Sequence, residues 1–356
     1  MRSKYSYLST SIVSFCFVVV LGSNLASGQT NSTVSKVGTI AASFLEIDVG
    51  ARAVGMGGAF VAVADDATAI FWNPAGLSRL KNSEAIIIHT NWLVATSFDF
   101  AGFVSPLGQW GTVAASITSL STDEMDVRTI QFQEGTGEKF SYSDLSLALS
   151  YAKNLTNRLS IGVNAKYISQ RIWHMSATGY AFDIGTLFRT QFNGLTIGMS
   201  ISNFGTAMRL EGKDTFVNYD EAPQFGGSNE RIPASKQTDK FPLPLLFRVG
   251  VSMDLLPGDA NQLLLAIDAA HPNDNTEYIN VGVEYVFNDI LALRWGYKNA
   301  FTLDTEEGFT AGAGTKFKLV GGVVLSIDYS YQDFGLLNYV QRFSLGFDFY
   351  HLISRG

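Results

Sequence analysis

The chain has 356 residues, of which 16% are charged and 13% are aromatic, and it contains 34 glycines against 8 prolines. Soluble domains carry about 25% charged residues, so this composition predicts a chain with a face that water does not wet. The net charge of -7 argues against a protein that binds nucleic-acid phosphates, which usually shows a basic patch or stripe. We therefore expect no nucleic-acid partner.

The first 28 residues have the layout of a secretory signal peptide. Arg2 and Lys4 precede an apolar run over 12–21, and small residues follow at 26–28, which is the typical order of charged, apolar and cleavage regions. The apolar run is too short for a transmembrane helix, which needs about 20 residues. We predict cleavage near Gly28, after which the mature chain contains no cysteine, because Cys16 lies within the signal.

Residues 29–83 are predicted to form an N-terminal lead followed by a hatch or plug. The segment from Gly50 to Leu77 combines small apolar residues with dense glycines, which allow close backbone approach and positive φ. Such a segment is suited to fit inside an enclosing structure. The residues that define the motif are Gly55, Gly57, Gly58, Asp65, Asp66, Asn73, Pro74 and Gly76.

Residues 84–356 are predicted to form the barrel, because fourteen strand-like runs separated by turn signals fill this part of the chain. In the run that begins at Leu159, apolar Ile161 and Val163 alternate with polar Asn164 and Lys166, as expected where side chains switch face at every residue. The runs lie at 84–93, 98–106, 108–118, 141–152, 157–170, 177–189, 195–203, 244–253, 262–270, 276–286, 290–298, 308–318, 321–332 and 339–350.

The polar faces of these runs favour a membrane barrel over a soluble sandwich. They contain mostly Ser, Gly, Ala and Asn with scattered charges, whereas a solvent-exposed face of this area would carry many Lys and Glu. Aromatic residues gather near run ends, as in an interfacial girdle; they include Trp92, Trp110, Tyr151, Tyr167, Trp295, Tyr297, Tyr329, Tyr331 and Tyr350. We predict an all-β fold, a 14-stranded antiparallel transmembrane β-barrel with the hatch in its lumen.

The lengths of the connections predict the orientation. Every second connection is short, beginning with Pro106-Leu107, whereas the others include the long ones, 119–141, 203–242 and 299–307. Outer-membrane barrels have short periplasmic turns and longer outer loops. We therefore expect an integral outer-membrane protein of a diderm bacterium with both termini in the periplasm and with lipid around its wall.

The segment from Asp48 to Ala67, followed by Trp72-Asn73-Pro74-Ala75-Gly76-Leu77, resembles the N-terminal signature of the PorV/PorQ family. That family resembles FadL, whose relatives are fourteen-stranded outer-membrane barrels with an N-terminal hatch. The stretch 241–250 also resembles the family's entry into a middle strand. The chain departs from many outer-membrane barrels at its end, because its last aromatic is Tyr350 and the sequence continues to Gly356.

The resemblance implies two functions of different kinds. A PorV-like barrel is a non-catalytic partner in type IX secretion, which docks at the translocon, receives cargo by its C-terminal domain and hands it on. A FadL-like barrel instead binds a hydrophobic small molecule and transports it. We favour the secretion hypothesis, since the resemblance to PorV/PorQ is the closer one, although a fold by itself does not imply a function.

The candidate functional residues have structural explanations beside functional ones. Asp65 and Asp66 offer too few oxygens for calcium and are expected to cap a turn or to pair with lumen arginines. Asn73-Pro74 is expected to fix a turn. Buried charges are usually paired, so the charges predicted to face the lumen are expected to tie hatch to wall; they are Lys166, Asp183, Arg248, Asp268, Glu284, Arg294, Asp328, Arg342 and Asp348.

No pattern in the sequence predicts a catalytic site, a metal site or a cofactor. The four histidines are scattered without the spacing of zinc ligands, and the glycine motif lacks the context of a dinucleotide fold. The connection 203–242 is too long for a simple turn, so it is either a binding loop or a cover of the lumen. Its candidate contact residues for a protein partner are Phe216, Tyr219 and Phe225.

Overall fold

The computed structural model describes residues 38–224, 226, 231–256, 261–302, 305–319 and 321–350. The predicted signal peptide lies outside these ranges, as do Phe225 and the residues that follow Tyr350. Among the described residues, no helix has the length and apolar character needed to span a bilayer.

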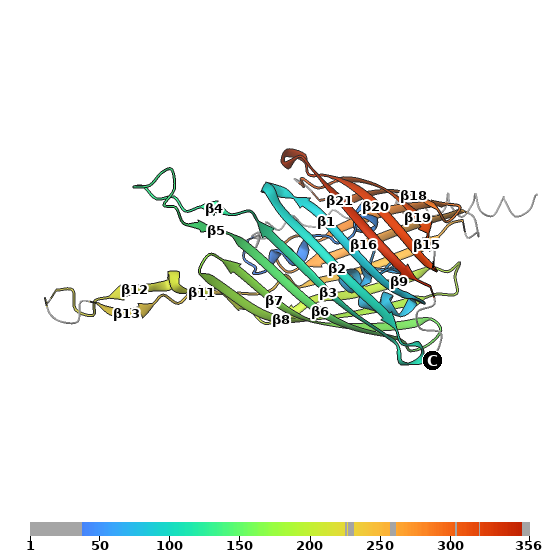
Figure 1. Cartoon of the computed structure of the whole chain (residues 1–356). Helices are drawn as coiled ribbons and strands as arrows, with labels where there is room; N and C mark the ends of the chain where they lie inside the picture. Colours follow the sequence, from blue (N-terminus) through green and yellow to red (C-terminus); the bar gives the residue numbers. More distant parts are fainter. Residues whose placement is uncertain are drawn as a thin grey trace, which may run out of the picture. The chain divides into compact units, whose positions relative to one another are not determined.

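Fourteen antiparallel strands form a closed barrel, as predicted (Figure 1). Each strand pairs with its neighbours in the chain, and β1 pairs with β21 to close the sheet, with Glu84 opposite Asp348. The wall strands are β1 (Ser83–Trp92), β2 (Thr96–Pro106), β3 (Thr112–Thr122), β6 (Tyr142–Asn154), β7 (Leu159–Ile172), β8 (Met175–Arg189), β9 (Thr196–Gly205), β15 (Leu246–Asp254), β16 (Asn261–Pro272), β17 (Tyr278–Phe287), β18 (Leu291–Ala300), β19 (Phe309–Lys318), β20 (Val323–Asp333) and β21 (Tyr339–Phe349).

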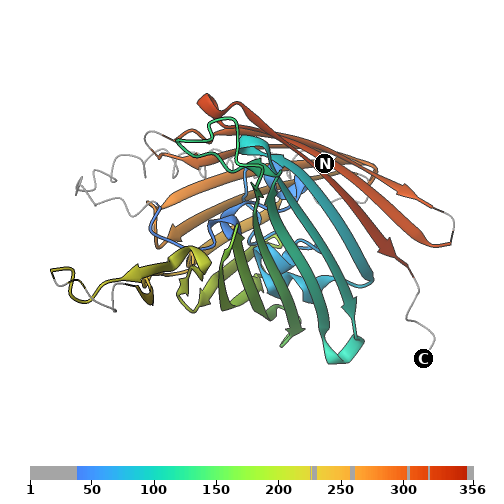
Figure 2. The same ribbon diagram turned by 60° about the vertical axis from the view of Figure 1, so that its left-hand side comes forward.

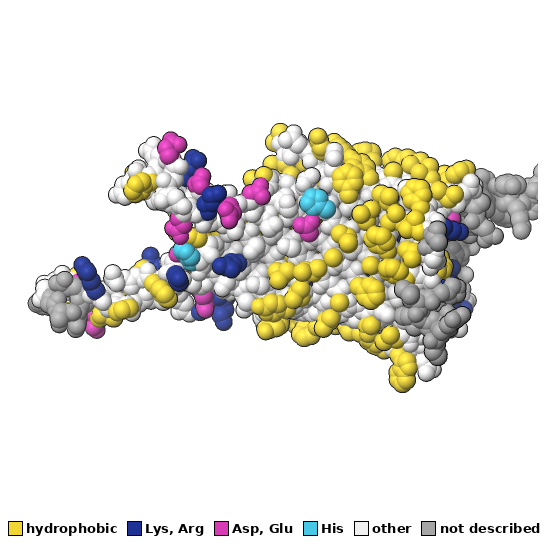
Figure 3. All heavy atoms as spheres, viewed as in Figure 1, with side chains coloured by type: hydrophobic (Ala, Val, Ile, Leu, Met, Phe, Trp, Pro, Cys, Tyr) yellow, Lys and Arg dark blue, Asp and Glu magenta, His cyan; other side chains and the backbone are white. Residues whose placement is uncertain are grey.

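The wall is apolar outside and polar within. Along β7, Ile161 and Val163 are exposed, whereas Asn164 and Lys166 are buried. Apolar side chains cover the body of the barrel in Figure 3, while most of the charged side chains in this view lie on the hairpins that project from one end. This inverted arrangement is that of a barrel whose outer face meets lipid.

The β2–β3 connection differs from the prediction. The run expected at 108–118 is a strand only from Thr112, because Gly108–Trp110 forms a 3-10 turn, η4. Gly108 and Gly111 have φ of 60° and 101°, a region that glycine adopts without steric cost. The alternation of β3 was visible in the sequence, but this left-handed turn geometry was not.

At the end of the barrel opposite the short turns, hairpins extend beyond the wall (Figure 1). They contain strands that do not belong to the closed wall; β11 pairs with the first residues of β8, and the others pair among themselves. These strands are β4 (Met125–Asp126), β5 (Lys139–Phe140), β10 (Met208–Arg209), β11 (Glu211–Gly212), β12 (Phe216–Tyr219), β13 (Ile232–Ser235) and β14 (Lys240–Phe241), with the 3-10 turn η5 (Lys213–Thr215) before β12. Two further 3-10 turns, η3 (Leu93–Ala95) and η6 (Gly335–Leu337), join β1 to β2 and β20 to β21.

Residues 41–80, which we call the lumen segment, are folded into short helical turns within the curve of the wall (Figure 2). The helix α2 (Ala51–Gly55) contacts β18 to β21, whereas the 3-10 turn η2 (Pro74–Arg79) contacts β6 to β8 on another part of the wall. The 3-10 turn η1 (Ser43–Glu46) and the helix α3 (Ala69–Trp72) complete the segment. Phe44, Phe60 and Trp72 are almost fully buried, and burial of each such side chain contributes roughly 1.5–3 kcal/mol.

Glycines on both sides allow the lumen segment to touch the wall backbone to backbone. Gly57 has φ of 66°, and a Cβ there would lie 2.8 Å from the backbone nitrogen of Tyr297. In the facing strands, a Cβ at Gly296 would collide with Gly57 N, and one at Gly282 would collide with Met56 O. The wall and the segment are therefore complementary at the level of the main chain.

We expect Gly296→Ala to destabilise the protein by about 1–3 kcal/mol, because the added methyl group has to displace the backbone of the lumen segment. The measurement is the urea midpoint of tryptophan fluorescence in detergent. Gly308→Ala is the matched control, since a Cβ there would have neighbours only at ordinary contact distance, the nearest at 3.7 Å. Equal midpoints for both variants would contradict the close packing at Gly296.

Candidate functional site

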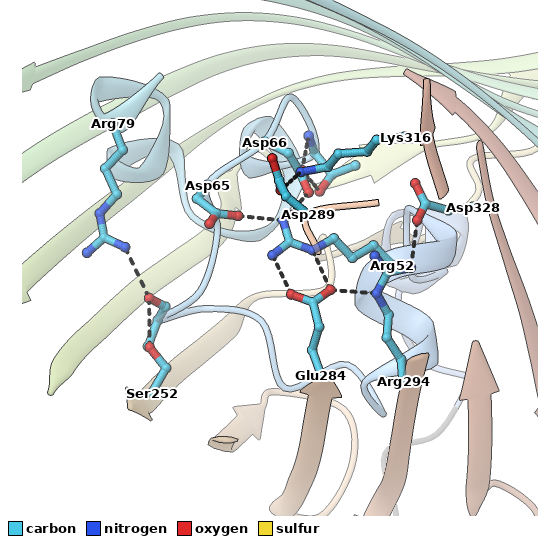
Figure 4. A network of polar contacts seen from close by, with 12 residues as sticks. Arg52, Asp65, Asp66, Arg79, Ser252, Glu284, Asp289, Arg294, Lys316 and Asp328 are labelled. Carbon is cyan, nitrogen blue, oxygen red and sulfur yellow. Dashed lines mark hydrogen bonds and ion pairs between the residues drawn. The ribbon is translucent and has the colours of Figure 1, made fainter. Parts of the chain in front are cut away.

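The candidate site is the contact between the lumen segment and the charged inner face of the barrel. An arginine of the segment, Arg52 in α2, lies at its centre (Figure 4). Its Nε and Nη2 donate to the two carboxylate oxygens of Glu284 in β17, at 2.9 and 2.8 Å. Its Nη1 contacts Asp65 Oδ1 at 2.5 Å and Asp66 Oδ2 at 3.0 Å. Arg52 therefore joins both acids of the segment to the wall.

The same carboxylate continues the network along the wall. Arg294 in β18 donates from Nε to Glu284 Oε2 at 2.6 Å and from Nη1 to Asp328 Oδ1 in β20, also at 2.6 Å. Glu284 and Arg294 expose only 5% of their side chains. Buried charges need partners of opposite sign and hydrogen bonds, and here each of the two buried wall charges has them.

Asp65 and Asp66 of the segment take part in a local turn and in an ion pair. Asp66 Oδ1 accepts hydrogen bonds from Thr68 N at 2.9 Å and from the Thr68 hydroxyl, just before α3. The arginine that pairs with Asp65 and Asp66 is Arg52 of the same segment, not one of the predicted wall arginines. Arg52 was missed in the sequence because it lies among small apolar residues; its position three residues before Gly55 carried no separate signal.

Asn73 fixes a turn of the segment against β8. Its side-chain nitrogen donates to the carbonyl oxygens of Val61 at 2.9 Å and Thr186 at 3.1 Å, and its Oδ1 accepts from Ala75 N at 3.2 Å. Pro74 is the first residue of η2, where its fixed φ suits a helical start. A Cβ on Gly76 would collide with Ala64 O. The close contact between these two parts of the lumen segment therefore requires glycine at position 76.

Asp268 and Asn164 bind the main chain of the segment from two other sides. Asp268 Oδ2 in β16 accepts from Phe60 N at 2.7 Å and Val61 N at 2.8 Å. Asn164 in β7 donates to Ile70 O at 2.6 Å and to Asp183 Oδ2 at 2.9 Å. Asp183 in turn pairs with Lys166 at 2.7 Å. These two predicted lumen charges therefore bind each other, and they reach the segment through Asn164.

Arg248, Arg342 and Asp348 have no ion pair among the described residues. The Arg248 guanidinium lies over the rings of Trp72 at 4.9 Å and Phe71 at 5.6 Å, a cation–π geometry. Arg342 lies over Trp92 at 5.2 Å and donates to Gln332 Oε1 at 2.8 Å. Trp92, which the sequence suggested for the outer girdle, is thus engaged with an inward-facing arginine. Asp348 accepts from Asn82 at 3.5 Å.

Asp48 belongs to a second ion-pair cluster, whose residues were not predicted from the sequence. Lys298 Nζ contacts Asp48 Oδ2 at 2.8 Å and Glu307 Oε1 at 2.9 Å. Burial acts to raise the pKa of Asp48, but the charge of Lys298, followed by that of Arg248, lowers it below the ordinary value. Asp48 is therefore an ionised anchor at the start of the segment. The only sequence signal was that Lys298 shares the polar face of Arg294.

Glu46 in η1 lies in the opposite electrostatic situation. Burial, and next the negative charge of Asp274, raise the pKa of Glu46 from 4.5 to about 7, although Arg248 and Lys298 act in the opposite direction. Asp274 belongs to the β16–β17 connection and is buried. The segment thus contains a carboxyl group that holds its proton under mildly acidic conditions.

No three His, Cys, Asp or Glu side chains among the described residues are placed to hold a metal ion together. Phe216 and Tyr219 lie far from the charged network in the sequence, on the β12 strand of a projecting hairpin, and both are exposed. The network consists mainly of paired ions and of hydrogen bonds to the main chain of the segment, so its arrangement supports the attachment of this segment to the wall.

We expect Arg52→Ala to destabilise the protein by about 3 kcal/mol, because it leaves Asp65 and Asp66 without their cation and Glu284 with one arginine in place of two. Arg52→Lys should recover part of this loss, since lysine keeps the charge but lacks the two-pronged geometry. Chemical unfolding in detergent measures both. The control is Lys316→Ala, which removes an exposed pair with Asp289 at 3.6 Å and should cost less than about 1 kcal/mol.

Glu46 makes stability depend on pH. The folded protein keeps the Glu46 proton up to about pH 7, whereas the unfolded chain releases it near its ordinary value of 4.5. Stability therefore falls as the pH rises through this window, by at most about 3 kcal/mol.

Glu46→Gln should remove this dependence, so the variant should match the parent at pH 4.5 and exceed its stability at pH 8. Unfolding midpoints over this range provide the measurement. Glu134→Gln, which changes an exposed residue of the β4–β5 connection, should leave the slope unchanged. The assignment would be contradicted if the unfolding midpoint of the parent rose between pH 5 and pH 7 and Glu46→Gln removed that rise.

Comparison with known proteins supports the barrel and identifies its family. Residues 29–222, more than half of the chain, match the family described as type IX secretion system protein PorV. No curated protein matches. Neither the matched family nor the structural relatives are described as enzymes.

Solved structures share the fold at low sequence identity. The Pseudomonas putida toluene transporter TodX is 11% identical with a TM-score of 0.53, over 84% of this chain and 97% of that one. The Ralstonia pickettii toluene transporter TbuX is 13% identical with a TM-score of 0.51, over the same shares. The CymD monoaromatic hydrocarbon channel is 11% identical with a TM-score of 0.51, over 85% of this chain and 97% of that one. By the match over residues 29–222, this chain belongs to the PorV family of type IX secretion system proteins.

Proposed function

We propose that this protein is a non-catalytic outer-membrane partner in type IX secretion, which docks at the translocon and hands on cargo by its C-terminal domain. The family match over residues 29–222 carries this proposal. In it, the lumen segment acts as a hatch, residues 29–83 form one unit with that role, and residues 84–356 form the barrel. Both termini lie in the periplasm, and the projecting hairpins face outward.

The contacts of the lumen segment support a closed barrel. It is bound to the wall by the Arg52–Glu284 pair, by two backbone hydrogen bonds to Asp268 and by the amide of Asn164. Opening a pathway would require breaking these contacts and separating the close backbone approaches at Gly282 and Gly296. A protein with such a lumen is suited to act through its outer surfaces.

The longest hairpin offers one such surface. The strands β12 and β13 pair only with each other, with Phe216 opposite Ser235 and Tyr219 opposite Ile232. Phe216 and Tyr219 expose 68% and 55% of their surface, and exposed aromatic residues are common energetic centres of protein interfaces. The third candidate, Phe225, lies outside the described residues but belongs to the same connection.

The alternative is transport of a hydrophobic small molecule, which the shared fold with TodX favours. Such a function needs a continuous apolar pocket beside the hatch. Four cavities of 400 to 730 Å³ among the described residues lie at the short-turn mouth and around the projecting hairpins. The cavity at the short-turn mouth adjoins the lumen segment at Ser78 and Leu80, but polar residues such as Lys81 and Asn154 also line it.

Deletion of the gene should prevent proteins with type IX C-terminal domains from reaching the cell surface, and the intact gene should restore them. A variant with residues 216–235 replaced by a short Gly-Ser linker should fold but fail to restore the phenotype, and it should recover about tenfold less translocon subunit or cargo in mild detergent. Surface labelling and co-purification measure the two effects.

The matched control replaces the β4–β5 connection between 127 and 138 in the same way, which tests whether the effect is specific to β12–β13. Normal surface display in the deletion strain would exclude the secretion function. Normal display with the 216–235 variant would exclude only this hairpin. Loss of toluene-like hydrocarbon uptake with normal secretion would favour the transport alternative.

A further inference from the structure

The mouth of the barrel at the short turns contains a cavity of about 570 Å³ that the proposed function does not use. It lies where the lumen segment leaves the barrel and continues into β1, and Ser78 and residues 80–83 form one side of it. The other side comes from the β2–β3 turn, the end of β6 and Phe349 at the end of β21. Chain segments distant in sequence thus enclose a single space.

The charged side chains that line this cavity are both lysines, Lys81 and Lys153. Neither has an ion pair among the described residues, and both are exposed. Asn82 also lines the cavity and donates to Asp348 at 3.5 Å, whereas no Asp or Glu belongs to the described lining. The lining is therefore electropositive and favours an anion.

The polar part of the lining is held in place by hydrogen bonds. Asn154 accepts from the hydroxyls of Ser78 at 2.7 Å and Ser160 at 2.6 Å, and it donates to Ser78 O at 3.0 Å. The β2–β3 turn is fixed by the Tyr151 hydroxyl, which donates to Trp110 O at 2.8 Å. The serine and asparagine part of the lining and the turn are thus preformed, and a bound anion would have to order only the two lysine side chains.

The surroundings of the cavity are apolar in a way that suits an amphiphile. Leu80, Pro106 and Phe349 belong to its lining, and the adjoining turn exposes Leu107 and Trp110, the latter by 70%. Exposed tryptophan beside lysine is typical of the level at which a barrel meets lipid headgroups. A free anion would use only the lysines, whereas a lipid would use both parts.

We propose that this cavity binds the phosphate headgroup of an anionic phospholipid, with Lys81 and Lys153 as its cationic contacts and with the acyl chains leaving past Leu107 and Trp110. Basic pockets at the membrane surface bind lipid headgroups by this combination of charge and apolar contact. A bound lipid would contact the residues that connect the lumen segment to β1. It would thereby join the segment, the five wall strands β1, β2, β3, β6 and β21, and the membrane at one point.

Native mass spectrometry of the full-length mature protein, released from detergent micelles, tests this proposal with three probes: dioleoyl phosphatidylglycerol, dioleoyl phosphatidylcholine and inorganic phosphate. We expect a phosphatidylglycerol adduct that is stronger than the phosphatidylcholine adduct. The double variant Lys81→Gln/Lys153→Gln should bind phosphatidylglycerol about tenfold more weakly, because it loses both charge-assisted contacts. Lys81→Arg/Lys153→Arg should retain binding.

The control is Lys213→Gln/Lys240→Gln, which removes two exposed lysines of the projecting region and should leave the adduct unchanged. The heat-dependent mobility of each variant on a gel verifies that the barrel is folded. Equal phosphatidylglycerol binding by the Gln variant of the cavity and by the parent would overturn the proposal. Binding of inorganic phosphate as strong as that of the lipid would overturn the lipid assignment and identify a free-anion site.

Discussion

A buried carboxylate shared by two arginines is the interaction on which the interior of this barrel depends. Glu284 binds Arg52 of the lumen segment and Arg294 of the wall, with both arginines donating to its oxygens. A charge removed from water is stable only with partners of opposite sign, so neither the wall nor the segment is electrostatically complete alone. The segment is therefore a structural requirement of the wall as well as a filling of its lumen.

Close main-chain contact adds to this electrostatic dependence. Gly57 of the segment faces Gly296 of β18 and Gly55 faces Gly312 of β19, and side chains larger than hydrogen would separate the two surfaces. Asp268 accepts a hydrogen bond from a backbone N–H of the segment and Asn164 donates one to a backbone carbonyl, which satisfies polar groups that have no access to water. These contacts make the interior rigid and leave the projecting hairpins and the short-turn mouth as the surfaces on which partners can act.

The sequence was most informative where a local period or motif carries the information. Alternation such as that of Ile161 and Asn164 placed the strands and their faces, and the Asn73-Pro74 pair placed a turn. It was less informative where two distant residues decide the outcome. Arg52, Glu46 and Asp48 were not singled out, because their importance comes from Glu284, Asp274 and Lys298, which lie more than 200 residues away in the chain. Trp92 shows the same limit, since its contacts with Phe334 and Arg342 come from residues more than 200 positions away in the chain.

The sequence by itself determined the fourteen-stranded barrel, its polar interior and the segment destined for close packing, because two-residue alternation and glycine density are local properties of the chain. Only the tertiary structure decided which charges meet, which of them rely on aromatic rings in place of ion pairs, and where a preformed cavity lies between Lys81 and Lys153. Closure of the barrel brings residues from opposite ends of the chain together, and the energy of a charge depends on those neighbours, which no local pattern encodes.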